Sequence, residues 1–197
     1  HNFSRHGELG VAMKKRVPLR RLIAILVLLA SGAASAQTTA TGTINATLIN
    51  KNAIALVFDT DPGGVPLGAS GSSAASLDFG TISASGPLSP GVTRPAITAT
   101  SFTVRSTFQI GVTQGGLNST SYTLSASLAS PAPTGLSYKV DAVTLTAAAQ
   151  NIQTNGIFDT DIAHNLDLVV STAAPGAGGP AVGVPLATTI NFTATAN

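Results

Sequence analysis

Residues 121–128 read Ser-Tyr-Thr-Leu-Ser-Ala-Ser-Leu, an unbroken alternation of Ser or Thr with Tyr, Leu or Ala. A period of two predicts a β-strand that turns one face to a core and the other to solvent. Eight further segments alternate in a similar way, and each is expected to form a strand: 43–49, 53–59, 77–82, 97–105, 108–112, 136–146, 166–171 and 188–195. The chain is therefore expected to be all-β.

Turn-forming residues stand between these segments. Pro62-Gly63-Gly64 and Gly115-Gly116 are typical of the sequences that end strands. Two longer stretches rich in small residues, 62–76 and 173–184, are expected to be surface loops. Short strands punctuated in this way predict a single antiparallel β-sandwich domain over residues 49–197.

The N-terminal part of the chain has the pattern of a secretion signal. Lys and Arg cluster within residues 13–21, an apolar run follows over 22–30, and Ala34-Ser35-Ala36 precedes Gln37. This order of a basic, an apolar and a small-residue segment predicts a signal peptide over residues 13–36. We therefore expect export through the general secretory pathway.

A retained membrane anchor is the alternative for this segment. The apolar run is too short to span a bilayer as a stable helix, so the alternative is disfavoured and no membrane span is expected after removal of the signal. Residues 1–12 precede Met13, the single methionine of the chain, and are interpreted as upstream read-through. Residues 37–48 then form an N-terminal extension ahead of the sandwich domain.

Removal of the leader reverses the net charge. Four basic and seven acidic residues remain after position 36, which gives a formal charge of −3: Lys51, Arg94, Arg105, Lys139, Asp59, Asp61, Asp78, Asp141, Asp159, Asp161 and Asp167. Binding to nucleic acid requires clustered Lys and Arg, so a nucleic-acid partner is not expected. The chain has no cysteine, so disulfides and lipidation of a cysteine are excluded.

Residues suited to catalysis are scarce. After position 36 the chain has one histidine, no cysteine and no glutamate. A Ser-His-Asp arrangement would need His164 together with Asp161 or Asp167, and no serine lies in the sequence context of a nucleophile elbow. We expect no enzymatic activity and no cofactor.

Two acidic turns are weak candidates for calcium. Phe58-Asp59-Thr60-Asp61 and Phe158-Asp159-Thr160-Asp161 repeat the same four residues. Carboxylates two positions apart can offer oxygen ligands, but four of them fall short of the six to eight that Ca²⁺ takes. Aspartates that hydrogen-bond their own turns are the alternative, and we expect no metal site.

The two ends of the exported chain carry apolar faces that a neighbouring strand could cover. In the N-terminal extension one face of an extended segment holds Ala40, Gly42, Ile44, Ala46 and Leu48. The last strand alternates in the same way, with Ile190, Phe192 and Ala194 on one face. A terminal strand with one apolar face is open to pairing with a strand from another copy.

These features resemble a known family. The leader, the alternating N-terminus, Leu77-Asp78-Phe79-Gly80-Thr81, the 121–125 strand and the closing Ile190-Asn191-Phe192-Thr193-Ala194 are similar to the spore coat protein U group and its relatives, the chaperone-usher pilins. The chain departs from many members in having no cysteine, and Ala196 stands where classical pilins carry an aromatic residue.

The resemblance implies a fold, a function and partners. The subunit is expected to be an incomplete immunoglobulin-like antiparallel β-sandwich, completed by a donor strand from a neighbouring subunit. Ala40, Ile44, Ala46 and Leu48 would fill pockets, and Gly42 would lie where any side chain meets the groove floor. The implied function is a structural subunit of an extracellular pilus or fimbria on the cell surface. Its partners would be further copies of itself, with a periplasmic chaperone and an outer-membrane usher.

A secreted monomeric β-sandwich adhesin or glycan-binding protein is the alternative function. Such proteins stack sugars on aromatic side chains, and this chain has no tryptophan and two tyrosines. The sequence therefore favours the filament subunit.

We predict that the exported protein begins at Gln37, because the signal peptide is removed after Ala36. Intact-mass measurement of protein recovered from outside the cell tests this. A mass that still includes residues 22–30 would show that the segment is an anchor.

Overall fold

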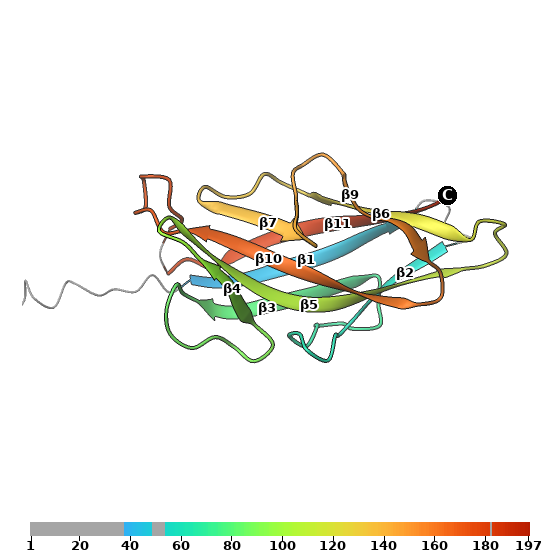
Figure 1. Cartoon of the computed structure of the whole chain (residues 1–197), viewed down its shortest axis with the longest axis horizontal. Coiled ribbons are helices and arrows are strands. Elements are labelled where there is room, and N and C mark those ends of the chain that lie inside the picture. The colour runs from blue at the N-terminus through green and yellow to red at the C-terminus, as the bar shows by residue number, and fades with distance from the viewer. Residues whose placement is uncertain (1–37, 49–53, 182) are drawn as a thin grey trace, which may run out of the picture. The chain divides into compact units, whose positions relative to one another are not determined.

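The computed structural model describes residues 38–48, 54–181 and 183–197 (Figure 1). The predictions for the read-through (1–12), the signal peptide (13–36) and Gln37 fall outside these residues. In the described part every regular element is a strand: β1 (Thr38–Leu48), β2 (Ile54–Asp59), β3 (Ala74–Ile82), β4 (Thr93–Ile97), β5 (Ser101–Gln114), β6 (Ser121–Leu128), β7 (Leu136–Val140), β8 (Val143–Thr144), β9 (Gln150–Ile157), β10 (Asp161–Ser171) and β11 (Leu186–Ala196). The expected all-β class is confirmed. Over the same residues no helix is long and apolar enough to cross a membrane.

The strands form two sheets. One has the order β3-β1-β11-β6-β9, and the other has the order β2-β5-β10-β7-β8 with β4 paired to β5. Strands are antiparallel to their neighbours throughout, except that β1 runs parallel to β11. Figure 1 shows β1 lying along β11 within its sheet. The first and last described strands are therefore direct neighbours.

The alternation seen in the sequence places the core between the sheets. In β6, Tyr122, Leu124, Ala126 and Leu128 are buried, while the Ser and Thr between them are partly exposed. The other sheet contributes the alternate residues of β5 and β10 in the same way. Burial of apolar side chains from both sheets is the main stabilising term of such a layered fold.

The charged residues are distributed unevenly between the sheets. Of the strands in the β3-β1-β11-β6-β9 sheet, only β3 carries a residue of the Asp, Glu, Lys or Arg type, Asp78. Arg94, Arg105, Lys139 and Asp167 lie on strands of the other sheet. The outward faces of β6 and β11 thus present Ser, Thr and Asn without charge.

Several strand predictions differ from the structure: β4 was not expected, and β10 begins at Asp161 instead of residue 166. The segments 97–105 and 108–112 are largely one strand, β5, because the inward Ser106 is satisfied by the backbone N–H of Val65, 2.9 Å from its Oγ, and does not interrupt the sheet. The segment 136–146 is a hairpin of β7 and β8, turned by Asp141 and Ala142 with φ of 47° and 70°. The strand β9 was not expected, because its Gln- and Asn-rich sequence lacks an apolar face.

Three phenylalanines connect the two sheets. The ring of Phe192 on β11 lies 5.5 Å from that of Phe58 and 5.9 Å from that of Phe108, both edge to face at 71°. Phe58 and Phe108 lie 6.4 Å apart on the facing sheet. All three side chains are fully buried. Aromatic pairs in this geometry stabilise a core beyond the area they bury.

We predict that Phe192→Ala lowers the free energy of unfolding by about 3–5 kcal/mol, because it removes both edge-to-face contacts and leaves a cavity. Urea denaturation followed by circular dichroism measures the change. The matched control is Thr195→Ala on the exposed side of the same strand, expected to change stability by less than about 0.5 kcal/mol. Equal effects of the two substitutions would contradict the proposed role of the aromatic cluster.

Candidate functional site

The candidate site is the β1 slot, which we define as the position in the sheet between β3 and β11. On one side β1 pairs in parallel with β11, from Ala40 opposite Leu186 to Leu48 opposite Ala194. On the other side it pairs antiparallel with β3, from Thr38 opposite Ile82 to Asn45 opposite Ala74. The predicted donor-strand residues Ala40, Gly42, Ile44, Ala46 and Leu48 all fall within this paired stretch. The structure thus brings the expected N-terminal and C-terminal strands together.

Ile44 joins β1 to the core. Its side chain is 0% exposed, and it lies opposite Ile190 on β11 and Ala75 on β3, which are also buried. Full burial of an isoleucine contributes about 1.5–3 kcal/mol relative to exposure. Ile44 therefore stabilises the strand in the β1 slot through side-chain packing in addition to its backbone pairing.

Gly42 differs from its expected role. It lies opposite Thr188 on β11 and Leu77 on β3. A Cβ built at this position would lie 3.7 Å from the Leu77 carbonyl oxygen, which is an ordinary van der Waals contact. The expectation that any side chain would meet the groove floor is wrong for the first carbon, so alanine fits here.

The closing strand β11 belongs to the body of the sandwich. Ile190, Phe192 and Ala194 are buried as their alternation indicated. At the chain end, the Asn197 backbone N–H donates to the Ser121 carbonyl at 3.0 Å and its side-chain amide donates to Ser121 Oγ at 2.9 Å. These bonds fix the end of β11 against β6.

The strand and the slot belong to one chain in this structure. Only residues 49–53 lie between the end of β1 and the start of β2, which pairs in the opposite sheet. Every other strand of the β3-β1-β11-β6-β9 sheet lies beyond β2 in the sequence. The sheet is therefore completed by a terminal segment that a short connection joins to the rest of the domain.

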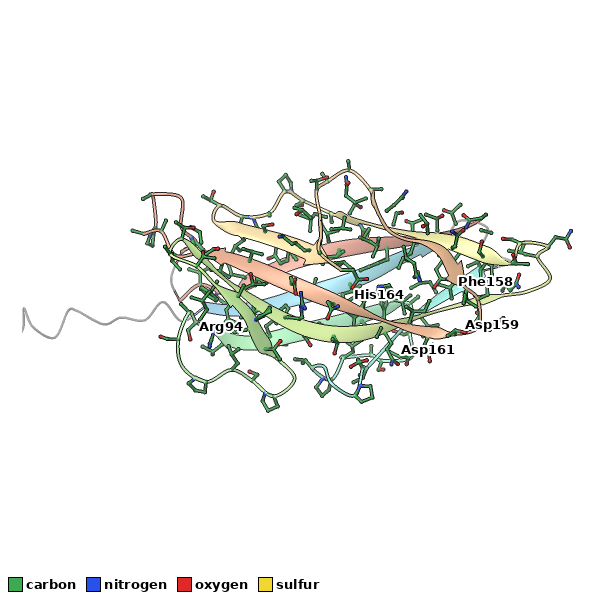
Figure 2. All side chains as sticks on the ribbon, viewed as in Figure 1. Arg94, Phe158, Asp159, Asp161 and His164 are labelled. Carbon is green, nitrogen blue, oxygen red and sulfur yellow. The ribbon has the colours of Figure 1, made fainter. Side chains whose placement is uncertain are left out.

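The calcium candidates do not converge. Asp59 ends β2 and lies opposite Gln109 on one side of β5, whereas Asp161 starts β10 and lies opposite Gly111 on the other side. Figure 2 places Asp159 and Asp161 together at the turn before β10. Within the described ranges no group of three or more His, Cys, Asp or Glu residues could hold a metal ion.

Asp61 acts as a turn former that also bonds to a strand. Its Oδ1 accepts hydrogen bonds from the Gly63 N–H at 2.8 Å and from Thr107 Oγ1 at 2.8 Å. Its Oδ2 accepts a hydrogen bond from Gln109 Nε2 at 3.4 Å. The bond to the Gly63 N–H is typical of an aspartate that hydrogen-bonds its own turn, which was the alternative to a calcium ligand.

His164 pairs with neither of the aspartates considered for a triad. His164, labelled in Figure 2, is 2% exposed. It packs against the ring of Phe108, and its Nδ1 lies 2.5 Å from Asp141 Oδ2. Asp167 instead accepts two hydrogen bonds from Arg105, at 2.6 and 2.8 Å. The His164–Asp141 pair is not evident from the sequence, because the two residues are 23 positions apart in the chain and the turn at Asp141 brings them together.

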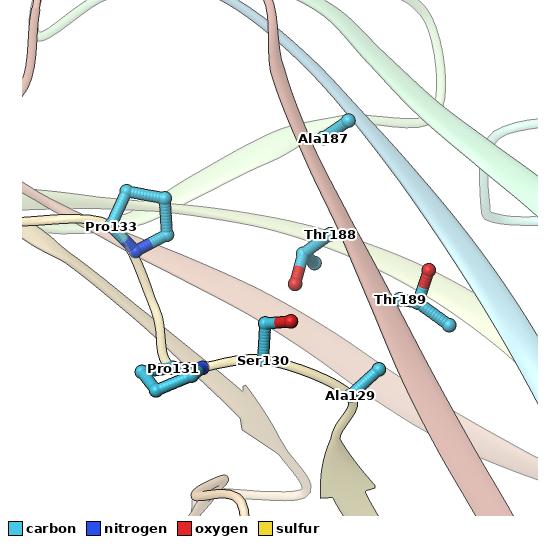
Figure 3. Close-up of a pocket in the computed structure, with 7 residues that line it drawn as sticks. All are labelled: Ala129, Ser130, Pro131, Pro133, Ala187, Thr188 and Thr189. Atoms are coloured by element: carbon cyan, nitrogen blue, oxygen red, sulfur yellow. The ribbon is translucent and has the colours of Figure 1, made fainter.

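A small groove lies between the start of β11 and the loop that follows β6. It has a volume of about 340 Å³, and it is lined by Ala129, Ser130, Pro131, Pro133, Ala187, Thr188 and Thr189 (Figure 3). The lining holds no ionisable side chain and no aromatic ring. It therefore offers neither a general acid or base nor a surface on which a sugar could stack.

No protein-family model matches the chain, and no curated protein is significantly similar to it. The geometry of the β1 slot is thus the main ground for assigning a function.

The Asp141–His164 pair makes stability depend on acid pH. Burial raises the pKa of the Asp141 carboxyl, but hydrogen bonds from His164 and from the Asn165 N–H outweigh burial and hold the pKa below its ordinary value. A carboxyl whose pKa is lowered on folding stabilises the fold above its unfolded pKa of about 3.9, and this contribution disappears as pH falls through the folded pKa.

We predict that Asp141→Asn, which suits the positive φ at this position, lowers the free energy of unfolding at pH 7 by about 1–3 kcal/mol. The difference from the unsubstituted protein should shrink below about pH 4. Urea denaturation at a series of pH values tests this, with Asp159→Asn in an exposed turn as the control. A difference that stays constant into acid would contradict it.

Proposed function

We propose that this chain is a structural subunit of an extracellular filament that polymerises by donor-strand exchange. In this proposal residues 54–197 form an incomplete immunoglobulin-like sandwich, and the N-terminal strand of one subunit completes the sandwich of the next. The observation that carries the proposal is the position of β1, which pairs along both edges with β3 and β11 and is joined to the domain by residues 49–53 alone.

An empty β1 slot would lower the stability of the domain. Removal of β1 would leave two unpaired strand edges, on β3 and β11, and would uncover the core where Ile44 lies. Unpaired edges beside apolar surface readily bind another strand. A second copy of this chain carries a strand that fits, so exchange between copies keeps every slot filled.

The described features agree with a passive building block. The groove of Figure 3 has no group suited to catalysis, and His164 and Asp141 are engaged with one another. The resemblance to the spore coat protein U group and the chaperone-usher pilins adds the location, a filament on the cell surface. It also adds the accessory partners, a periplasmic chaperone and an outer-membrane usher that would handle the subunit before assembly.

The alternative is a secreted monomeric adhesin. One observation favours it, namely that β1 fills the slot of its own chain and leaves that subunit complete. A monomer closed in this way needs no neighbour. The two functions differ in whether strand exchange occurs, so the test is directed at the strand.

We predict that Ile44→Asp abolishes filaments, because it would bury a charge at a position that is 0% exposed, at a cost of several kcal/mol. The variant should remain an exported but unstable monomer that accepts a peptide of residues 38–48 in trans. Electron microscopy of sheared cell-surface material and size-exclusion chromatography with the peptide measure the two effects. Ile190→Asp should instead unfold the subunit, because β11 belongs to its own core.

The matched control is Asn45→Asp, which introduces the same charge at the adjacent position of β1, where the chain already carries a polar residue. It is expected to leave filaments intact. Normal filaments from Ile44→Asp protein would exclude strand exchange through β1. A wild-type protein that is exported only as a monomer would favour the adhesin.

A further inference from the structure

The direction of β1 in its slot limits what a second copy can build. Among the described strand pairs, β1 and β11 form the one parallel pair. Ala40 lies opposite Leu186 at the start of β11, and Leu48 lies opposite Ala194 near its end. The C-terminal end of β1 therefore points to the same end of the sandwich as the chain terminus.

We call this end of the sandwich the hinge end. It holds Leu48, the last residue of β1, and Ile54, which starts β2 opposite Gln114. It also holds Asn197, which bonds to Ser121. The opposite end, which we call the far end, holds Thr38 with its partner Ile82, and Leu186.

A strand donated in the observed direction would bring two hinge ends together. Leu48 of the donor would leave the acceptor at the acceptor's hinge end, and Ile54 would re-enter the donor at the donor's own hinge end. The connection from Leu48 to Ile54 spans at most roughly 20 Å when fully extended. The two hinge ends must therefore lie side by side. This relation is symmetric, so the acceptor can return its own β1 to the donor.

We propose that the chain forms a closed, two-fold strand-swapped dimer with a second copy of itself, in which each β1 lies parallel to β11 of the other copy. The dimer keeps every pairing of β1 that the structure contains, and it needs only a different path for residues 49–53. Because both slots are filled and both strands are used, the dimer has no free slot with which to grow.

The hinge end carries a feature that fits such a contact. Ile157 at the end of β9 is 64% exposed and lies opposite Ser121, which bonds to the chain terminus. The adjacent loop from 115 to 120 has no charged residue. Two hinge ends that face each other would cover Ile157, and they would also bring together the exposed Asp159 and Asp161 of both copies, a repulsion that salt screens.

A filament requires the other strand direction. With β1 antiparallel to β11, Leu48 would leave the acceptor at its far end and meet the donor's hinge end, so that subunits follow one another head to tail without closure. The dimer depends only on the observed register, whereas its role as a non-growing reserve of filament subunits rests on the proposed function. The direction of β1 relative to β11 would then distinguish the non-growing dimer from the filament.

Engineered disulfides can determine whether β1 runs parallel or antiparallel to β11, because the chain has no cysteine of its own. Thr47 lies opposite Thr193 in the observed register. If β1 ran antiparallel to β11 while Ile44 stayed opposite Ile190, Thr47 would lie opposite Ala187 instead. Thr47→Cys protein is mixed with Thr193→Cys protein, unfolded in urea, refolded together at high concentration and oxidised. The parallel experiment mixes Thr47→Cys with Ala187→Cys.

We expect the 47–193 combination to give covalent dimers of fixed mass by light scattering, and we expect filaments to carry the 47–187 link. Ile157→Asp should weaken dimerisation about tenfold, because it removes apolar area from the contact, and should leave the stability of the monomer unchanged.

Two outcomes would overturn the dimer: no 47–193 covalent dimers at any protein concentration, or 47–193 links that hold chains together in long filaments. The first would leave the filament proposal intact. The absence of filaments from the unsubstituted chain would count against the filament proposal and would leave the dimer intact.

Discussion

The pairing of β1 with strands on both sides is the interaction on which the described fold depends. One strand edge satisfies β11 and the other satisfies β3, and Ile44 fills the core between them. Strand β1 lies between β3 and β11, two strands that are far apart in the sequence. Because backbone groups need partners and the core needs cover, the slot cannot stand empty without a large loss of stability.

The two sheets differ in their charged residues and in the side-chain contacts that they hold. The sheet that contains β1 presents a nearly uncharged outer face of Ser, Thr and Asn, and its inner face carries Phe192. The opposite sheet holds the Arg105–Asp167 ion pair and the His164–Asp141 pair, which tie β5 to β10 and β10 to the β7–β8 turn. Both of these ion pairs thus lie in the sheet opposite to β1. The described contacts of β1 are its two backbone ladders and the burial of Ile44.

Strands with complete alternation could be predicted from the sequence. An edge strand, the direction of strand pairing and a long-range side-chain pair could not, because they depend on contacts between distant residues. Strand β6 matches its prediction because Ser and Thr alternate with apolar residues without a break. Strand β9 has no such signal, because its side chains are mostly polar and, among the described strands, it pairs with β6 alone at the edge of its sheet. The paired faces of β1 and β11 were visible in the sequence, but their parallel direction was not, because alternation has no polarity. The His164–Asp141 pair depends on a two-residue turn with positive φ at both positions, which the sequence did not disclose.

The parallel arrangement of β1 and β11 also determines how the domain responds to force. The first described strand and the last one lie side by side, with Thr38 beyond one end of their ladder and Asn197 beyond the other. Tension applied between these two residues pulls the strands along each other, so it loads the whole ladder at the same time and does not open its bonds one after another. The domain is therefore built to resist stretching along this axis, a mechanical property that suits a protein held at both ends.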